Sequence, residues 1–257
     1  MIKLYRVILP ILLVCAVLSG CVFQSLHHNN TGQTIPSYEN TTQETPGPST
    51  TESVPETTVE PETVPVTQPY VAEPADSEFV LIREYIPDIV VDLKYATEDN
   101  FTGQVIYSFT EPYARYGTVK KLQTAQAMLA PLGYGLKVWD AFRPVSAQYK
   151  LWEVCPDPTY VANPNNGFSS HSRGNTVDIT IIRLEDGSEL TMPTGFDDFS
   201  AMANRDYSDC SQEARENAVL LEVIMTACGF KGYYGEWWHY TDETVHEVEQ
   251  SFDPAGE

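Results

Sequence analysis

The sequence has few basic side chains, and its first third has almost none. Across 257 residues there are 15 Lys and Arg against 36 Asp and Glu, which gives a formal net charge of −21 at pH 7. Between residues 22 and 76 there is no Lys or Arg. Proteins bind nucleic acid by neutralising phosphates with Lys and Arg, which releases counterions. The composition therefore argues against a nucleic-acid partner.

A long apolar run is also missing. The run near the N-terminus, Val7 to Val17, has about half of the ~20 residues that a membrane-spanning helix needs. It follows Lys3 and Arg6 and leads into small residues, which is the layout of a secretory signal. Residues 1–20 are therefore predicted to direct export and not to span the membrane.

This signal ends in the stretch Leu18-Ser19-Gly20-Cys21, which resembles the bacterial lipobox. The resemblance implies that a peptidase cuts before Cys21 and that Cys21 becomes a lipidated N-terminus. The protein would then be exported and lipid-anchored to the outer face of the cell membrane. An ordinary signal peptide with an incidental cysteine is the alternative.

Residues 21–76 are rich in Thr, Pro and Glu and contain few large apolar side chains. Such a segment buries too little apolar surface to offset the entropy of ordering it, so we predict that it is disordered. Proline and like charge keep such a chain extended. We expect a tether that leads to a single domain at residues 77–257, which is long enough for a substantial core.

The cysteines of this domain do not form a metal-binding pattern. They are Cys155, Cys210 and Cys228, and their spacing resembles no zinc knuckle. In an exported protein two of them could form a disulfide and leave one thiol. Cys228 falls within an apolar helical pattern, where a cysteine usually behaves as a small buried hydrophobe.

The domain has no internal repeat, and its apolar patterns predict both helices and strands. Helical spacing occurs at Val119 to Leu132, Ser146 to Cys155 and Gln212 to Cys228, with glycine following the first and the last. Strand patterns occur at Gly135 to Asp140, Thr176 to Leu184 and Trp237 to Thr241, besides two short runs within Phe79 to Tyr95. The order is not a regular βαβ series, so we expect an α+β fold with a small central antiparallel sheet flanked by helices.

Two of the three histidines of the domain, His171 and His239, lie close to acidic residues. From Ser169 to Asp178 the chain has a histidine at a loop end, then a glycine turn, then an aspartate that enters a predicted strand. In Gly235-Glu236-Trp237-Trp238-His239-Tyr240, a glutamate and a histidine flank two tryptophans that could wall a dry cavity. Catalytic zinc takes three protein ligands and an open position for water. Two imidazoles, one carboxylate and a spare glutamate as general base meet this need.

Each of these residues has a structural explanation when it is taken alone. A single histidine beside aromatic residues is more often a core residue than a ligand. Asp178 in an apolar strand could be a buried carboxylate, although such a group needs a partner. The combination of the two stretches favours a metal site.

The two stretches resemble the signatures Ser-x-His-x-x-Gly-x-x-x-Asp and Glu-x-x-His of the zinc D-Ala-D-Ala metallopeptidases. The form Glu236-Trp237-Trp238-His239-Tyr240 is similar to the VanX-type dipeptidase branch of that family, as are the stretches from Asp92 to Gly103 and from Asp140 to Pro144. The resemblance extends from about Val80 to Thr241. It implies a single catalytic domain that holds one zinc ion per chain and hydrolyses D-Ala-D-Ala or a related wall peptide.

The resemblance also implies roles for individual residues. By position, the zinc ligands are His171, Asp178 and His239, and the general base is Glu236. Arg143 corresponds to an arginine that stabilises the tetrahedral intermediate, which a fixed guanidinium can do. A salt bridge to the nearby Asp140 is the alternative explanation of Arg143.

Two further positions are implied to contact substrate. Ser169 corresponds to a serine that hydrogen-bonds the substrate, although a serine that only caps the loop is an equal alternative. Asp197 resembles the acidic partner of the substrate amine, but its neighbour Asp198 and a solvated loop charge leave that assignment open. Tyr95 and Phe101 fit core aromatic residues better than pocket walls.

The chain departs from the family pattern in two ways. Asn175 and Thr176 stand where small residues are usual, and an exported enzyme does not meet the cytoplasmic dipeptide on which resistance-type dipeptidases act. We therefore expect a role in turnover of dipeptide released from the cell wall. A D,D-carboxypeptidase that trims stem peptides is the first alternative, and two bulky indoles in a small closed pocket would disfavour it. A wall-binding module without catalysis is the second, and it would not need Glu236.

Overall fold

The computed structural model describes residues 72–256; the predicted signal, most of the tether and Cys21 lie outside this range. The described chain contains four α-helices: α2 (Ile82–Tyr85), α3 (Tyr116–Leu129), α4 (Val145–Val154) and α5 (Gln212–Ala227). Its strands are β1 (Phe79–Leu81), β2 (Val90–Val91), β3 (Tyr113–Arg115), β4 (Tyr134–Asp140), β5 (Thr176–Arg183), β6 (Phe230–Tyr233) and β7 (Glu236–Asp242). Short 3-10 helices are η1 (Lys94–Ala96), η2 (Ala130–Leu132), η3 (Ser170–Arg173) and η4 (Ala201–Ala203). Within residues 72–256, no helix is long and apolar enough to cross a bilayer.

The centre of the domain is a five-stranded sheet in the order β2-β4-β5-β7-β6, and β1 and β3 pair in a separate two-stranded sheet. Pairs β4–β5, β5–β7 and β6–β7 are antiparallel, as expected. The edge strand β2 differs, because it runs parallel to β4. A parallel pair needs a long crossover, and α3 lies in the connection between these two strands. The predicted α+β fold is confirmed, with this one parallel edge.

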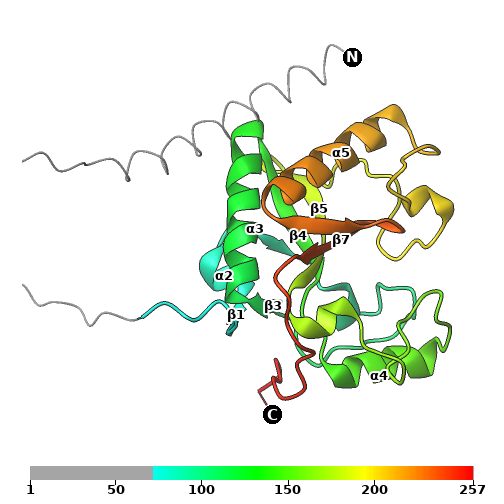
Figure 1. Cartoon of the computed structure of the whole chain (residues 1–257). Helices are drawn as coiled ribbons and strands as arrows, with labels where there is room; N and C mark the ends of the chain where they lie inside the picture. The colour runs from blue at the N-terminus through cyan, green and yellow to red at the C-terminus, as the bar shows by residue number, and fades with distance from the viewer. Residues whose placement is uncertain (1–71, 257) are drawn as a thin grey trace, which may run out of the picture. The chain divides into compact units, whose positions relative to one another are not determined.

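Two groups of buried apolar residues hold the layers together. The larger group joins α3, α5 and the sheet and includes Leu122, Val138, Ile179 and Leu221, all completely buried. Each such side chain stabilises the fold by about 1.5–3 kcal/mol. A smaller group, centred on Leu151, lies beneath α4. In Figure 1, α5 lies above the strands of the sheet and α4 lies below them.

The long predicted elements are present and two short ones were missed. The helices and strands expected after residue 115 match α3, α4, α5, β4, β5 and β7 to within a few residues. The strands β3 and β6 were not expected, and α2 replaces part of an expected extended run. Elements of three or four residues are too short to show a hydrophobic period, so only tertiary pairing defines them.

The domain cysteines form no disulfide in the described chain. Cys228 packs against the larger core group, and its Sγ lies 3.7 Å from Sδ of Met128. This contact agrees with the expectation that Cys228 acts as a small apolar side chain. Within residues 72–256, no disulfide joins two of these three cysteines.

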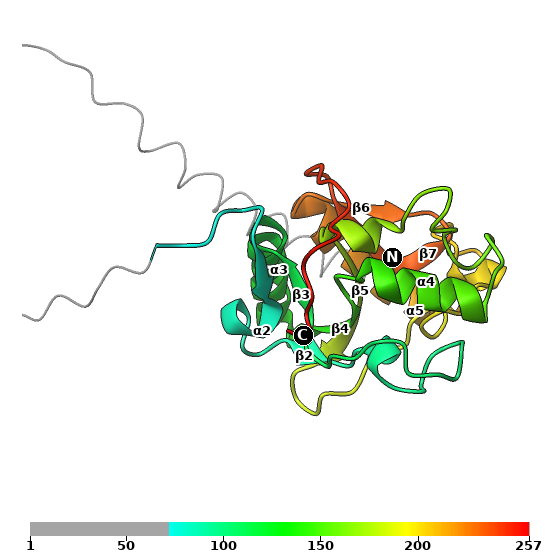
Figure 2. The same ribbon diagram turned by 90° about the horizontal axis from the view of Figure 1, so that it is seen from below.

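After β7 the chain continues without regular structure, and we call residues 243–256 the C-terminal strap. Figures 1 and 2 show the strap in red, beside β3. Its backbone amide at Glu249 donates a hydrogen bond to the carbonyl oxygen of Ser172 in η3, at 2.8 Å. The ring of Phe252 stacks on Phe79, with 4.3 Å between ring centroids. The strap thus fastens η3 from the outside of the domain.

Candidate active site

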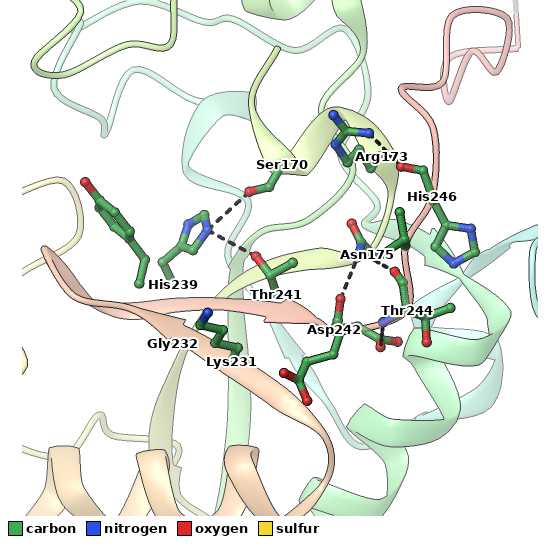
Figure 3. A pocket seen from close by; sticks show the side chains of 13 residues that line it. Ser170, Arg173, Asn175, Lys231, Gly232, His239, Thr241, Asp242, Thr244 and His246 are labelled. Carbon is green, nitrogen blue, oxygen red and sulfur yellow. Dashed lines mark hydrogen bonds between the residues drawn. The ribbon is translucent and has the colours of Figure 1, made fainter. Parts of the chain in front are cut away.

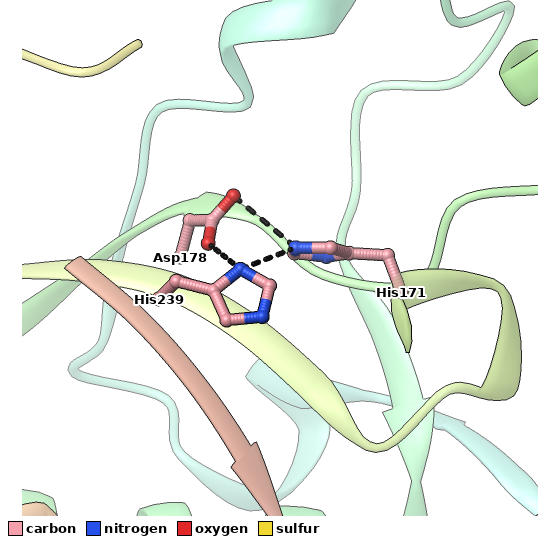
Figure 4. Close-up of side chains that lie close together, drawn as sticks. All are labelled: His171, Asp178 and His239. Carbon is pink, nitrogen blue, oxygen red and sulfur yellow. Dashed lines mark hydrogen bonds and ion pairs between the residues drawn. The ribbon is translucent and has the colours of Figure 1, made fainter. Parts of the chain in front are cut away.

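The sheet and η3 bring the three predicted zinc ligands together. Asp178 in β5 and His239 in β7 are directly opposed across the strand pair. His171 extends from η3, so that its Nε2 lies 3.3 Å from Asp178 Oδ2 and 3.3 Å from His239 Nδ1. His239 Nδ1 is 3.1 Å from Asp178 Oδ1. Figure 4 shows the carboxylate facing the inner nitrogen of both rings.

Gly174 makes the turn that places His171 beside β5. Its φ is +77°, in the left-handed region that side chains rarely adopt. A Cβ at this position would also lie 2.3 Å from the ring of Phe79. Both the conformation and the contact therefore require glycine between the histidine and the aspartate.

The arrangement of donor atoms fits a zinc ion. Ligands about 2.0–2.1 Å from a tetrahedral zinc lie about 3.3 Å from each other. Here the two imidazole nitrogens are 3.3 Å apart, and each lies 3.1 to 3.3 Å from one of the two carboxylate oxygens of Asp178. Asp178 Oδ1 is buried and makes no hydrogen bond, despite its short distance to His239. A buried oxygen without a hydrogen bond is costly, and a cation among these atoms would remove that cost.

The outer nitrogens of both imidazoles have partners that orient the rings. His171 Nδ1 donates a hydrogen bond to the Ala141 carbonyl oxygen, at 2.8 Å, which leaves a lone pair on Nε2. His239 Nε2 lies 3.3 Å from the Ser170 hydroxyl and 3.5 Å from the Thr241 hydroxyl (Figure 3). Such partners fix the tautomer and direction of metal-binding histidines. Both inner nitrogens thus face Asp178.

The surrounding charges favour a cation at this point. Burial lowers the pKa of His171, but the carboxylates of Asp178 and Asp140 outweigh burial and raise this pKa. Burial likewise raises the pKa of Asp178, but the positive charges of His171 and His239 beside it lower it overall. A cluster that stabilises a proton in this way also stabilises a metal ion, because both are positive.

Glu236, the first residue of β7, lies next to this cluster. Its Oε2 is 3.3 Å from Nδ1 of His239, and its side chain is 23% exposed. Burial raises the pKa of Glu236; the negative charge of Asp178 adds to this effect, and His239 opposes it. A carboxyl group with a raised pKa can accept a proton near neutral pH and also return it.

Asp140, at the end of β4, holds Arg143 in a fixed position. Arg143 Nη2 donates to Asp140 Oδ2 at 2.7 Å, and Nη1 donates to Gln148 at 3.2 Å. Tyr107 donates to the second oxygen of Asp140 at 2.6 Å. The salt bridge suggested as an alternative is therefore present, and it orients a guanidinium that lies 5.0 Å from the centre of the Tyr95 ring. Burial alone lowers the pKa of Arg143, but the charge of Asp140 keeps this pKa well above its usual value.

Asp197, and not its neighbour Asp198, faces the same region. The Tyr95 hydroxyl donates to Asp197 Oδ2 at 2.8 Å. Burial raises the pKa of Asp197 well above that of an ordinary aspartate. Its φ of +55° is uncommon for a residue other than glycine and often marks a functional position. Asp198 is exposed and accepts a hydrogen bond from the amide of Ser200.

These side chains line one hollow of about 340 Å³. Ser169 lies in its wall, and its Oγ also accepts a hydrogen bond from the His171 amide at 3.3 Å, so the loop-capping role is present. Tyr95 is buried and lines the hollow, which corrects its interpretation as a core residue only.

The two tryptophans do not wall this hollow. Trp237 and Trp238 are each 1% exposed and belong to the larger core group. Both faces of β7 are covered, so successive side chains are buried on opposite sides of the strand. The aromatic wall comes instead from Tyr95, Tyr160, Phe168, Phe199 and Tyr233. The inference of a small closed pocket from two indoles was wrong.

Comparison with known sequences agrees with this geometry. The sequence pattern of the M15 peptidases described as D-Ala-D-Ala dipeptidase matches residues 75–253. The chain belongs to this family. It is accordingly a metallopeptidase, as predicted from the His-x-x-Gly-x-x-x-Asp and Glu-x-x-His stretches.

Three similar proteins are named D-alanyl-D-alanine dipeptidase. The Escherichia coli (strain K12) protein is 37% identical over 164 residues, which cover 64% of this chain and 84% of that protein. The Enterococcus faecalis protein is 32% identical over 184 residues, covering 64% and 91%. The Streptomyces coelicolor protein is 33% identical over 195 residues, covering 68% and 96%.

The stretch from Asp92 to Gly103, which resembles the dipeptidase family, forms a loop that carries Tyr95. The side-chain Nδ2 of Asn100 lies within hydrogen-bond distance, 2.7 to 3.2 Å, of the carbonyl oxygens of Lys94, Thr97 and Gln104. Sequence reasoning missed the link between Tyr95 and Asp197, because the two residues are 102 positions apart. It also missed Ala141, whose contribution is a backbone oxygen and leaves no trace in residue type.

The third histidine of the domain, His246, lies outside the cluster of His171, Asp178 and His239. His246 lines a second hollow, of about 610 Å³, on the Nε2 side of His239 (Figure 3). The two hollows share Ser170, Tyr233 and His239. The ring of His239 therefore forms part of the wall between them.

Proposed function

We propose that this chain hydrolyses D-alanyl-D-alanine to D-alanine, using one zinc ion held by His171, Asp178 and His239. The observation that supports this most is the convergence of these three donors in one hollow with Glu236 and Asp197. A base at the metal and an acid that receives an amine are what a dipeptidase needs. The similar proteins from three bacteria are named for the same substrate.

Glu236 acts as the general base in this proposal. Zinc, when bound, would polarise the scissile carbonyl and make a water molecule more acidic. Glu236 removes a proton from the attacking water and then gives it to the departing amine. Its raised pKa and its position beside His239 suit both transfers.

The remaining polar residues bind and orient the substrate. Arg143 stabilises the oxyanion of the tetrahedral intermediate, and the Asp140 salt bridge keeps the guanidinium oriented before the reaction begins. Asp197 pairs with the free amine of the dipeptide. The hydrogen bond from Tyr95 holds the Asp197 carboxylate in position. Ser169 supplies a hydroxyl from the wall of the hollow.

The test measures release of free D-alanine from D-Ala-D-Ala by the chain from residue 22 onward, with one equivalent of zinc. Glu236→Gln keeps the shape of the side chain and removes its basicity, so we expect a loss of 10²–10⁴ in kcat with zinc still bound. Release by the wild type together with this loss supports the proposal. A wild type that binds zinc but leaves the dipeptide intact contradicts it.

An acylated D-Ala-D-Ala tripeptide distinguishes the proposed dipeptidase from a D,D-carboxypeptidase. Acylation removes the charged amine, so the carboxylate of Asp197 would lose its partner in the complex. Because burial already disfavours that ionised carboxylate, we expect the acylated substrate to react at least 10²-fold more slowly, equivalent to about 2.7 kcal/mol. Equal or faster hydrolysis of the acylated peptide would assign the carboxypeptidase activity instead.

We propose further that the enzyme is exported, is lipid-anchored through Cys21 and acts in turnover of cell-wall peptides. The support is the signal layout and the lipobox-like stretch before Cys21. Growth with radiolabelled palmitate should label the wild-type chain in the membrane fraction, and Cys21→Ser should abolish the label. An unlabelled wild type that remains in the cytosol would contradict the anchor and the role together.

A further inference from the structure

Arg205 has no role in the chemistry described so far, yet its side chain is only 7% exposed. It lies in the segment between η4 and α5. Burying a guanidinium is costly unless its donors are satisfied. The partners of Arg205 are therefore informative.

Strand β7 is irregular in the stretch that carries Glu236 and His239. In the β6–β7 pair, Tyr233 is opposite Glu236, but the next residue back along β6, Gly232, is opposite Tyr240. Trp237, Trp238 and His239 therefore have no partners in β6. On its other side β7 remains paired with β5, where His239 is opposite Asp178. The bulge thus occupies the interval between the proposed base and the proposed metal ligand.

The guanidinium of Arg205 replaces the missing strand partners. Nη2 donates to the carbonyl oxygens of Trp237 and His239, at 2.9 and 3.0 Å. Nε donates to the carbonyl oxygen of Tyr233 at 2.8 Å, and Nη1 donates to the Tyr240 hydroxyl at 3.1 Å. One planar group thereby joins the last residue of β6 to both sides of the bulge.

The local sequence leaves space for this group and keeps it charged. A Cβ on Gly232 would lie 2.3 Å from Arg205 Cζ, so glycine is needed beneath the guanidinium. The cation is 4.4 Å from the centre of the Tyr240 ring and 3.5 Å from Glu222 Oε2. Lysine would not replace it, because an ammonium cannot present donors in a rigid planar fork.

We propose that Arg205 is a positioning residue, which sets the spacing between Glu236 and His239 by fixing the carbonyl groups of the β7 bulge. The inference rests on the proposed function, since that function gives Glu236 and His239 their roles. It does not require Arg205 to touch substrate or metal. Loss of the guanidinium would let the bulge relax and would move both side chains relative to Asp178.

The experiment compares Arg205→Lys and Arg205→Ala with Arg215→Ala in the chain from residue 22 onward. Arg215 is the matched control, because its side chain also donates to backbone carbonyl oxygens, those of Tyr207 and Ser208. Zinc affinity is measured by chelator competition, and kcat and KM are measured separately. Unfolding of the metal-free protein gives the stability of each variant.

We expect both Arg205 variants to bind zinc 10- to 100-fold more weakly, the range found when groups that orient metal ligands are removed. At saturating zinc, kcat should fall at least 10-fold with a smaller change in KM, and millimolar guanidinium ion should restore part of kcat in Arg205→Ala. Arg215→Ala should change neither zinc affinity nor kcat. Gly232→Ala, which displaces the guanidinium, should resemble Arg205→Lys.

Lower stability without a change in zinc affinity or kcat would overturn the proposal and leave Arg205 a structural residue. If Arg205→Ala fails to fold, Arg205→Lys and Gly232→Ala decide the question by the same measurements. If the wild type binds zinc but does not cleave D-Ala-D-Ala, the proposed function fails. The zinc affinities still show in that case whether Arg205 positions His239.

Discussion

Burial and the hydrogen bond from Tyr95 act in opposite directions on the pKa of Asp197, at one end of the hollow. Burial holds the pKa of Asp197 well above the value of about 3.9 for a free aspartate. Only the ionised form attracts an ammonium group. We therefore expect KM for D-Ala-D-Ala to rise as the pH falls, beginning at a higher pH than an ordinary aspartate would give. Initial rates from pH 5 to 8 test this, and a flat KM over that range would contradict the pairing.

Asp197 should also reduce the stability of the free enzyme. A carboxyl group whose pKa is raised on folding binds more protons in the folded state, so stability falls as pH rises from the unfolded to the folded pKa. At pH 7 Asp197→Asn removes this penalty and still accepts the Tyr95 hydrogen bond. We expect an increase of about 0.5–2 kcal/mol in the free energy of unfolding, measured in urea, together with loss of dipeptide affinity. Asp198→Asn, at the exposed neighbour, should change neither quantity.

At the scale of elements, two glycines allow the backbone strain of losing glycine to be distinguished from the steric clash. Gly174 lies in the turn from η3 into β5, and Gly187 lies after β5. Gly174 and Gly187 have similar φ values of +77° and +74°, but a Cβ on Gly187 would meet nothing within 4 Å. Gly187→Ala should lose about 1 kcal/mol from left-handed strain. Gly174→Ala should lose about 1–3 kcal/mol more by displacing Phe79, and it should also weaken zinc binding. Equal losses in thermal unfolding would contradict the steric argument.

A buried ion pair connects α3 with the end of β7. Asp242 accepts hydrogen bonds from Lys121 and Thr118, and its side chain is 1% exposed. Burial raises the pKa of Asp242, but these hydrogen bonds and those from Thr244 lower it overall. A depressed pKa stabilises the fold above the unfolded pKa of about 3.9, and this contribution is lost as the pH falls through the folded pKa.

Lys121→Met should therefore lower the free energy of unfolding at pH 7 by about 1–3 kcal/mol, because it leaves a buried carboxylate without its charged donor. The deficit should shrink as the pH approaches 3. Urea titrations at both pH values measure it. Lys120→Met is the control, since Lys120 pairs with Asp76, whose side chain is 69% exposed. The prediction fails if both variants lose the same stability.

The predictability of each element followed its length and its environment. Helices α3 and α5 contain enough residues to display a hydrophobic period and were predicted from it, whereas β5 was predicted from its near-continuous β-branched run. The bulge in β7 was not foreseeable, because it depends on Arg205, which reaches β7 from a distant segment. The indoles of Trp237 and Trp238 were misplaced for a similar reason. Their sequence neighbours indicate a site, but the layers on either side of β7 decide which way they point.

At the scale of the whole molecule, residues 72–256 contain every group that the proposed reaction uses. Residues just inside this range already belong to the domain, since Asp76 pairs with Lys120 and the Ser77 carbonyl accepts from Arg115. We expect a chain that begins at residue 72 to match the longer chain within twofold in kcat/KM and within about 0.5 kcal/mol in stability. A chain that begins at residue 78 should be less stable. A large loss of activity already at residue 72 would assign the preceding segment a function in catalysis.

The sequence predicted the residues that come together in the site. It predicted the groups that surround them less well. His171, Asp178, His239 and Glu236 stood in two short stretches with recognisable spacing, and the sheet brings those stretches together. The supports of the site are carbonyl oxygens, hydroxyl groups and a distant guanidinium, and no spacing rule links these groups to the stretches they support. Tertiary contacts alone specify them.

The C-terminal strap has a consequence for truncated forms of the chain. Glu249 and Phe252 follow all three donor residues in the sequence; Glu249 donates to the carbonyl oxygen of Ser172 in η3, and Phe252 stacks on Phe79 of β1. A chain that ends before the strap has every donor but lacks the contacts that hold His171 in place. We therefore expect a chain truncated before Glu249 to keep the full donor set and still compete poorly for scarce metal.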